Sequence, residues 1–412
     1  MIEIICTCAR GTSLAVVHEL RALGATDIVD EDAAVSAKGE LDLIPRANVF
    51  LRTVSRVLLV IERFSGIATP EDLIEALSKI PFEERIDGKG TFCVDAHLKD
   101  TPWTHSLYAA QRVKDVVLDR LRSLGHGRPN IDTVRPSVRF VLSWRGQEVV
   151  LAVDTSGDAL HKRGYRNGVE GRAPLKETLA SALLAIGHAD VSRPFIDPCC
   201  GTGTLAIEQA WRALNRAPGR DRRFGFERWK DRPPALDRAL ALARTEARDG
   251  ERLSLPAPIH ASDWHNEAID HVTQCVRQAG LDKHIAITRV DARAAAMPGE
   301  HPLIVSNLPF GERLASNRAG GNRLQLEGFY RTLGDRCASI DGARVILFSA
   351  HEHARWWLHL DERAVGKPRR WRFSAGDLDA TLYRYDMPWA SQKEAIPQKD
   401  TQPSSSSSKS RA

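Results

Sequence analysis

The chain has 412 residues, of which 42% are hydrophobic, and a formal net charge of +5. This length suits two or three domains, and the composition supports a sizeable buried core. No apolar run approaches the ~18 residues that a transmembrane helix needs, and the N-terminus lacks the features of a secretory signal. Seven Cys without CxxC spacing disfavour both a disulfide scaffold and a zinc knuckle. We therefore expect a cytoplasmic protein without membrane spans.

The charge is distributed unevenly along the chain. Residues 1–155 hold 19 Lys and Arg against 22 Asp and Glu, residues 156–388 hold 35 against 29, and the tail from 389 holds 4 against 2. Proteins that bind nucleic acids usually carry a basic surface. If the first part of the chain binds RNA, it must therefore rely on a local basic group.

The first 155 residues read as two small α+β units. Residues 1–50 begin with a strand over 2–6 and a helix over 13–23 that Gly24 ends. In the second unit, residues 51–155, Thr69 followed by a proline and two acids predicts the start of a helix. The other elements expected there are strand 57–61, strand 91–97, helix 108–124 and a hairpin of 137–144 with 148–154.

The third unit, residues 156–388, alternates strands and helices. This pattern predicts a Rossmann-like, doubly wound α/β sheet that is mostly parallel, with the last two strands as an antiparallel edge. Ligands of such sheets bind beyond the carboxyl ends of the strands. The tail, residues 389–412, includes a serine run and is expected to be disordered. The predicted strands are 193–197, 258–263, 284–290, 302–307, 343–349, 369–374 and 380–386.

The first candidate site follows the strand that ends at Asp197, with the sequence Asp-Pro-Cys-Cys-Gly-Thr-Gly-Thr over residues 197–204. Gly201 and Gly203 let the backbone turn tightly beside a ligand, and a helix that starts near Thr204 points free N–H groups towards it. A purely structural turn and a phosphate site are the alternatives. The lack of a Lys after the glycines, together with Asp197, favours a ligand that carries an amino group.

Two further acids follow the next two predicted strands. Asp263 ends one of them, where a carboxylate is able to accept hydrogen bonds from both hydroxyls of a ribose. Asp291 follows the other and is placed to accept from an adenine amino group. Each acid alone is more often a solvated loop residue, but three successive strands that end in Asp favour a nucleoside cofactor.

The second candidate site is Ser-Asn-Leu-Pro-Phe-Gly over residues 306–311. The side-chain oxygen of Asn307 and the backbone carbonyl of Leu308 are suited to accept hydrogen bonds from an amine that is to be methylated. Pro309 stiffens the loop, and Phe310 offers a ring on which an extruded base is able to stack. The alternative is a turn with Pro as breaker and Phe as core, which the three acids disfavour.

Together these motifs resemble the class I S-adenosylmethionine-dependent methyltransferases, and more closely the guanine-N2 RNA methyltransferases that carry a THUMP domain. The pattern is similar to the N-terminal half of the bifunctional bacterial 23S rRNA guanine-N2 methyltransferases. The resemblance extends to about residue 388. It includes Ala-Arg-Gly at 9–11, Gln-Arg-Val-Lys-Asp at 111–115, Asp-Thr-Ser-Gly at 154–157 and His-Lys-Arg-Gly-Tyr-Arg at 161–166.

The resemblance implies a ferredoxin-like unit over 1–50, a THUMP RNA-binding domain over 51–155 and a methyltransferase domain over 156–388. It implies S-adenosyl-L-methionine as cofactor and the N2 amine of a guanine in structured RNA, most closely 23S rRNA, as acceptor. In catalysis it implies Asn307, Leu308, Pro309 and Phe310. For cofactor binding it implies Asp197, Cys199, Gly201, Gly203, Thr204, Asp263 and Asp291.

Two departures from the family pattern concern the substrate. The family more often has Met-Cys-Gly-Ser where residues 199–202 are Cys-Cys-Gly-Thr, and Asn-Pro-Pro-Tyr-Gly where residues 307–311 are Asn-Leu-Pro-Phe-Gly. Leu308 is similar to the tRNA enzymes of the THUMP group. A tRNA guanine-N2 methyltransferase, a non-catalytic THUMP RNA-binding or assembly factor, and a DNA or protein amine methyltransferase are therefore the alternatives. The loop chemistry alone serves adenine N6 as well as guanine N2.

The predicted RNA contacts are basic residues of the THUMP helix and of segments near the catalytic site: Arg112, Lys114, Arg166, Arg222 and Arg223. The arginine-rich stretch 212–232 is equally compatible with a solvated face. His351 and His353 lack a further ligand pair, so no metal is expected. Nothing in the sequence indicates the oligomeric state.

Overall fold

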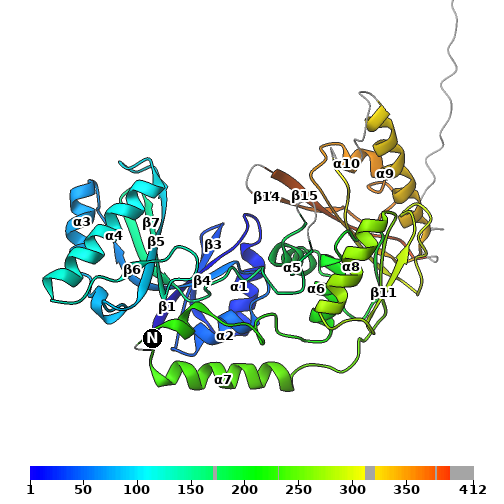
Figure 1. Ribbon diagram of the computed structural model, residues 1–412. Helices are drawn as coiled ribbons and strands as arrows, with labels where there is room; N and C mark the ends of the chain where they lie inside the picture. Colours follow the sequence, from blue (N-terminus) through cyan, green and yellow to red (C-terminus); the bar gives the residue numbers. More distant parts are fainter. Residues whose placement is uncertain (170–173, 231, 311–320, 376–377, 390–412) are drawn as a thin grey trace, which may run out of the picture.

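The computed structural model describes residues 1–169, 174–230, 232–310, 321–375 and 378–389. These residues form two sheets with flanking helices; in Figure 1 the first sheet runs from the left to the centre of the molecule and the second lies at the right. Within these ranges no helix combines the length and the apolar character that crossing a bilayer requires. All but the first residue of the predicted disordered tail lies outside the described residues.

The first sheet joins the two N-terminal units, in the order β2-β3-β1-β4-β8-β7-β5-β6. Strand β4 is the link, because it pairs antiparallel with both β1 and β8. The chain order β1-α1-β2-β3-α2-β4 is that of a ferredoxin-like unit, and β4 lies after residue 50. The domain boundaries remain predictions. The bounds are β1 Ile2–Thr7, β2 Thr26–Asp30, β3 Ala34–Gly39, β4 Arg56–Phe64, β5 Thr91–Lys99, β6 Asn130–Ile131, β7 Val138–Arg145 and β8 Glu148–Asp154.

The helices that pack on this sheet were predicted from the sequence only in part. Thr69 caps α3 (Pro70–Ser78) as expected, since its hydroxyl accepts from Asp72 N at 3.2 Å and the Asp72 carboxylate accepts from Thr69 N at 2.9 Å. The predicted helix 108–124 is α4 (Ser106–Ser123). The predicted hairpin is confirmed as β7 and β8. The sequence did not indicate β2, β3 or α2 (Leu43–Phe50), whereas α1 (Ser13–Ala22) agrees.

The second sheet has the order β11-β10-β9-β12-β13-β15-β14. The neighbours from β11 to β13 are parallel, and β15 and β14 form the antiparallel edge that was predicted. The core on its two faces includes the fully buried Phe195, Leu303 and Val345. The bounds are β9 Phe195–Asp197, β10 Ile259–Asp263, β11 Ile285–Arg289, β12 Leu303–Asn307, β13 Arg344–Ser349, β14 Arg369–Ala375 and β15 Leu378–Asp386.

The helices of the second half are α5 Glu177–Ile186, α6 Thr204–Ala213, α7 Pro234–Asp249, α8 Asn266–Gln278, α9 Gly321–Ser339 and α10 Ala354–Leu358. Most of them flank the second sheet, but α7 leaves it and runs beneath the ferredoxin-like unit, where it packs against α2 (Figure 1). Its apolar side chains Leu236, Leu240 and Ala243 share a core with α1 and α2. Part of the predicted catalytic domain therefore completes the core of the N-terminal unit.

A second link joins the N-terminal loop to the far edge of the catalytic sheet. Arg10 forms an isolated antiparallel bridge with Ser374 of β14. The next residue, Gly11, has a φ of +82°, and a Cβ there would lie 2.5 Å from the Arg372 carbonyl oxygen. Only glycine permits this close approach. The Ala-Arg-Gly motif at residues 9–11 is thus a contact between the two ends of the chain.

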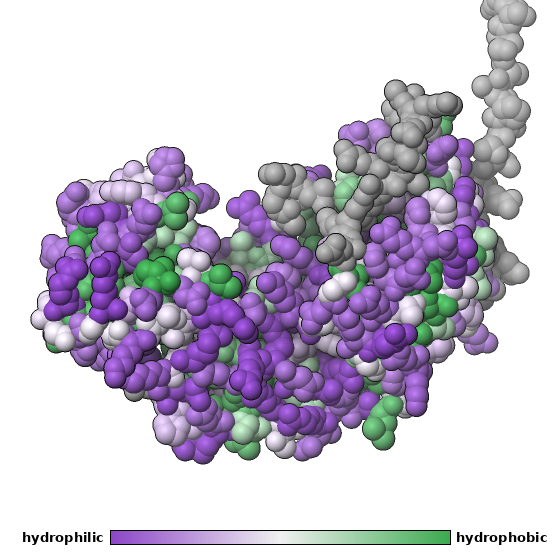
Figure 2. Space-filling model, viewed as in Figure 1, coloured by the Kyte–Doolittle hydropathy of each residue, from purple (hydrophilic) through white to green (hydrophobic). Residues whose placement is uncertain are grey.

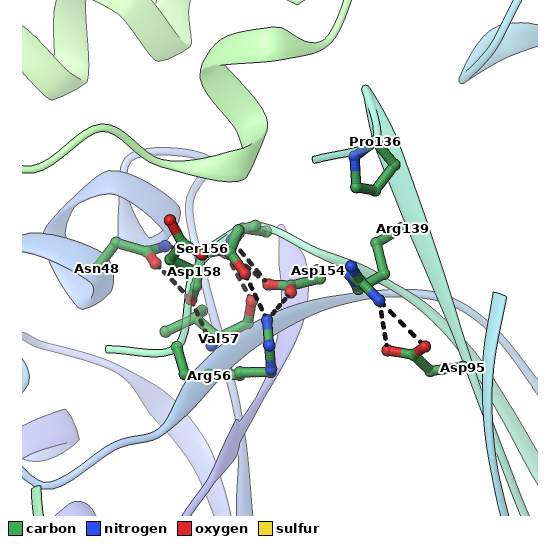
Figure 3. Close-up of polar contacts among 12 residues, drawn as sticks. Asn48, Arg56, Val57, Asp95, Pro136, Arg139, Asp154, Ser156 and Asp158 are labelled. Atoms are coloured by element: carbon green, nitrogen blue, oxygen red, sulfur yellow. Dashed lines mark hydrogen bonds and ion pairs between the residues drawn. The ribbon is translucent and has the colours of Figure 1, made fainter. Parts of the chain in front are cut away.

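The Asp-Thr-Ser-Gly motif at 154–157 forms the joint where β8 leaves the first sheet (Figure 3). The buried Asp154 carboxylate forms an ion pair with Arg56 and accepts from Ser156 N at 2.8 Å. The Ser156 hydroxyl donates to Asn48 Oδ1 at 2.7 Å and accepts from Val57 N at 2.9 Å. The polar groups of this buried joint are therefore paired with one another.

Candidate active site

Two sequence-predicted segments meet at the centre of the second sheet. Strand β9 ends at Asp197 and its parallel neighbour β12 ends at Asn307. From β9 the chain continues to one side of the sheet through β10, and it returns to the other side at β12. Ligands of open α/β sheets bind at such a switch point, beyond the carboxyl ends of the strands. The topology therefore brings the glycine turn and the Asn-Leu-Pro-Phe loop to one place.

Asp197 is 1% exposed and ends strand β9 at this switch point. Its Oδ1 accepts from the Ser306 hydroxyl at 2.7 Å and from Cys199 N at 3.2 Å. Burial raises the pKa of Asp197 to about 7, and the hydrogen bond from Ser306 opposes that rise. Ser306 thus joins the two predicted segments directly. The sequence contains no signal for this role of Ser306.

The glycine turn has the backbone shape that its sequence predicts. Gly201 and Gly203 have φ values of +53° and +77°. A Cβ on Gly203 would lie 2.5 Å from the Val272 side chain, whereas no described atom lies within 4 Å of a Cβ on Gly201. Gly203 is therefore required for packing against α8, and Gly201 leaves open space. Helix α6 starts at Thr204, a buried residue, as expected.

The two cysteines of the turn are not poised for nucleophilic chemistry. Cys200 is buried and Cys199 half-buried. Burial raises the pKa of both thiols well above the ordinary value, and the nearby Asp197 and Asp263 raise it further. Both thiols are therefore protonated at neutral pH, while the thiolate is the reactive form.

The other two predicted cofactor acids differ in their surroundings. Asp263, at the end of β10, binds the glycine turn: Oδ2 accepts from Gly201 N at 3.0 Å, and Oδ1 accepts from His265 N at 3.1 Å. Asp291 follows β11 and forms a two-pronged ion pair with Arg293 of the same loop, with distances of 2.6–3.1 Å. Asp263 is therefore part of the turn, and Asp291 is engaged within its own loop.

Asn307 carries an unusual acceptor. Its Oδ1 atom is shielded from solvent and has no hydrogen-bond partner among the described residues. Other buried polar atoms share this property, such as Trp144 Nε1 in the THUMP core. Asn307 differs from Trp144 because it ends a central strand at the switch point. An unpaired buried acceptor costs about 1–3 kcal/mol, so a donor is expected to reach it in the working state.

The rest of the loop is fixed from two sides. Leu308 is fully buried, and its N–H donates to the Phe348 carbonyl of β13 at 2.9 Å. The Pro309 carbonyl accepts from the Tyr330 hydroxyl of α9 at 3.0 Å, and Ser349 Oγ lies 2.8 Å from the same hydroxyl. Phe310 is half-buried, and Gly311 lies outside the described residues. The sequence gave no signal for Tyr330 or Ser349, because each is far from the motif.

The predicted RNA-binding residues fall into two groups. Arg112 and Lys114 of α4 lie 3.9 and 3.6 Å from Asp115, and Arg223 is exposed. Arg166 instead pairs with the buried Glu177 at 2.7 Å. Arg222 donates to four backbone carbonyls of residues 158–162. The guanidinium groups of Arg166 and Arg222 are thus engaged inside the protein, which favours a structural role.

Within the described ranges, no group of three or more His, Cys, Asp or Glu side chains lies close enough together to hold a metal ion. The ring of His351 packs 4.3 Å from Trp357, between centroids.

Three family models match the chain. They are the RlmL ferredoxin-like domain over residues 3–58, the THUMP domain over 68–154 and the RMKL-like methyltransferase domain over 163–367. They follow the order of the predicted units. The THUMP match ends with β8, and the methyltransferase match begins after the joint.

Two curated relatives cover almost the whole chain. A ribosomal RNA large subunit methyltransferase K/L of Syntrophotalea carbinolica is 36% identical over 399 residues, which is 94% of this chain and 54% of that protein. The chain thus spans about half the length of that relative. A putative RNA methyltransferase of Synechocystis is 30% identical over 383 residues, 92% of this chain and 96% of that protein.

Two solved structures share the fold. A putative methyltransferase complexed with SAH, SMU.472, has a TM-score of 0.80 at 23% identity, covering 93% of this chain and 97% of that one. A predicted N6-adenine-specific DNA methylase of Listeria monocytogenes has a TM-score of 0.80 at 29% identity, with 94% and 96% covered. From its three domain matches and its relative of similar length from Synechocystis, the chain belongs to the methyltransferase family that joins an RlmL-type ferredoxin-like domain, a THUMP domain and an RMKL-like methyltransferase domain.

Proposed function

We propose that this chain methylates the N2 amine of a guanine in 23S rRNA, with S-adenosyl-L-methionine as methyl donor. The observation that carries the proposal is the unpaired, buried Oδ1 of Asn307, an acceptor placed at the switch point where an amine would be held. The relative from S. carbinolica supports the choice of rRNA, and the THUMP match supports RNA in general. Guanine N2 follows from the resemblance of the motifs.

The described residues fit a nucleoside cofactor with an amino-acid end. The Asp197 carboxylate would accept from the amino group, Asp263 from the ribose hydroxyls and Asp291 from the adenine amine. The space beside Gly201 would admit a ligand against the backbone, and Cys199, Gly203 and Thr204 complete the turn. When bound, the cofactor supplies a methyl group that its sulfonium already activates. The SAH complex of the structural neighbour supports this class of cofactor.

The acceptor loop would hold and desolvate the amine. The lone pair of an exocyclic amine is delocalised into the base, so placement contributes most to the rate. Asn307 Oδ1 and the Leu308 carbonyl would accept from its two N–H groups and favour the tetrahedral nitrogen of the transition state. Phe310 would stack on the extruded base, worth about 1–3 kcal/mol. Tyr330 and Ser349 hold Pro309 and keep these acceptors in position.

The described part of the loop contains no side chain suited to act as a general base. Asn307 and Phe310 do not titrate, and burial raises the pKa of the nearby Tyr330 hydroxyl above its ordinary value. The surplus proton would therefore leave to water after methyl transfer. This favours a rate that depends on positioning more than on proton abstraction.

The test is a methylation assay on 23S rRNA and tRNA transcribed in vitro, followed by mass spectrometry of the nucleosides. The expected product is N2-methylguanosine from 23S rRNA, absent with Asn307→Ala. N2-methylguanosine from tRNA alone would assign the tRNA function. Detection of N6-methyladenosine instead would show that the methyl acceptor is the N6 amine of an adenine and not the N2 amine of a guanine. Calorimetry that finds no binding of S-adenosylmethionine would support a non-catalytic RNA-binding factor.

A further inference from the structure

Two neighbouring hollows lie where the THUMP strands meet the catalytic chain. Both are open to solvent, and both are lined by Ser137 and Arg228. We call them together the junction groove. Among the described residues, its cationic lining is Arg85, Lys89, Arg135, Arg139, Arg228 and Lys230. Its acids are Asp87, Asp154 and Asp158.

Internal pairing cancels part of this charge. Asp154 pairs with Arg56, and Arg139 pairs with Asp95 at 2.9 Å (Figure 3). Lys230 pairs with Asp87. Of the remaining charged residues in the lining, Asp158 is the acid. Four exposed cations have no acidic partner among the described residues: Arg85, Lys89, Arg135 and Arg228.

The catalytic chain supplies Arg228 and fixes it in place. Its Nε donates to the carbonyl of Pro136 in the THUMP domain at 2.9 Å. The turn that carries Arg228 rests on the joint, because Phe226 N donates to Thr155 O at 3.1 Å and a Cβ on Gly157 would lie 2.9 Å from Gly225 N. The groove is therefore a preformed surface shared by the THUMP domain and the catalytic chain.

The chemistry of the groove fits an RNA backbone better than a protein partner. Interfaces between proteins are depleted of charged residues at their centre, whereas surfaces that bind nucleic acid are polar and strongly positive. Here the lining is itself charged, and its cations outnumber its acids. Hydrophilic residues cover most of the face of the molecule that Figure 2 shows, and the hydrophobic ones lie in small, separate groups.

We infer that the junction groove binds phosphodiester groups of the substrate RNA, and that Arg228, rather than Arg222, is the arginine of the 212–232 stretch that contacts it. The inference rests on the proposed function for the choice of RNA. Because the THUMP domain and the catalytic chain would hold the RNA together, the groove would fix the distance from the bound RNA segment to the catalytic sheet.

The test measures binding of unmodified 23S rRNA, transcribed in vitro, over a series of salt concentrations. Lys89→Glu/Arg135→Glu changes two exposed side chains, so the fold is expected to persist. It should weaken binding roughly tenfold and lower the slope of log affinity against log salt by about 0.7–0.9 per lost contact. Arg228→Glu should act in the same direction. The matched control is Arg238→Glu/Arg248→Glu on the exposed face of α7, with affinity unchanged.

Two further readouts separate this inference from the proposed function. Cofactor affinity should be unchanged in the groove variants, whereas the KM for RNA in the methylation assay should rise. If the wild type methylates rRNA but the groove variants bind it as tightly, the groove inference is wrong. If the variants lose RNA affinity but the wild type methylates no RNA, the groove stands and the proposed function fails. Normal RNA affinity with methylation lost only on ribosomal particles would indicate an acidic protein partner and overturn the inference.

Discussion

Among the described residues, two strand ends carry a buried aspartate, and the surroundings of these two side chains differ. At the joint, Asp154 is paired with Arg56 and with backbone N–H groups, and neighbouring Asn48 and Ser156 pair with each other. At the catalytic edge, Asp197 has a hydroxyl and one N–H but no cation, and Asn307 Oδ1 has no partner among the described residues. The first region is complete by itself. The second region still has hydrogen-bond acceptors available, as expected of a site that binds a ligand with amino groups.

The largest effect is expected from removing the unpaired acceptor. Asn307→Ala should lower the single-turnover rate of methylation by about 10²–10³, the usual effect of deleting one transition-state hydrogen-bond partner. Cofactor and RNA affinity should change little. Because the atom has no described partner, the free energy of unfolding should not fall. A normal single-turnover rate would make the loop a structural turn only.

The joint should respond in the opposite way. Arg56→Ala leaves the Asp154 carboxylate buried without its cation, which should lower the free energy of unfolding by about 3 kcal/mol. Urea denaturation measures this. The control is Lys38→Ala, which removes an exposed ion pair with Asp27 and should cost less than about 1 kcal/mol. Equal midpoints for the two variants would show that the buried Arg56–Asp154 pair stabilises the fold no more than an exposed ion pair does.

The third prediction concerns the acid that joins the glycine turn to β10. Asp263→Ala should weaken cofactor binding by about one to two orders of magnitude, because charge-assisted hydrogen bonds to the ribose and the bond to Gly201 N are lost. Calorimetry gives the affinity. Asp270→Ala, in α8, is the matched control and should bind normally. Unchanged affinity for the Asp263 variant would remove the ribose assignment.

A smaller effect should depend on pH through Asp197. A cofactor amino group needs the ionised carboxylate, so with a pKa of about 7 the affinity should fall roughly tenfold from pH 8 to pH 6. The stability of the free protein should depend on pH in the opposite sense. Its folded form keeps the Asp197 proton longer than the unfolded chain does, so this group's stabilisation is present at low pH and is lost as the pH rises towards 7. Asp197→Asn should remove both dependences, and a pH-independent wild-type affinity would contradict the assignment.

The smallest effect is expected at the stacking position. Phe310→Tyr should leave methylation nearly unchanged, since the family usually has Tyr there. Phe310→Ala should raise the KM for RNA more than it lowers kcat, because stacking mainly captures the base. Steady-state assays on the rRNA transcript separate the two constants. A strong loss with Tyr would mean that the ring is packed inside the loop.

Local patterns predicted the catalytic region well. Short apolar strands and the glycine turn are specified by neighbouring residues, so the parallel sheet and the meeting of residues 197 and 307 followed from the sequence. The sequence did not reveal the continuous first sheet, because pairing of β4 with β8 joins residues about 90 positions apart. The sequence also did not reveal that Tyr330 contacts Pro309, or that Arg222 donates to backbone carbonyls, because in each case the two partners are far apart along the chain.

The bridge between Arg10 and Ser374 has a consequence for how the protein meets other molecules. Strand β14 is an edge of the second sheet, and an open edge is a template for pairing with another molecule. Here a loop of the N-terminal unit pairs with part of that edge. The N-terminal unit therefore shields part of β14 from strands of neighbouring molecules.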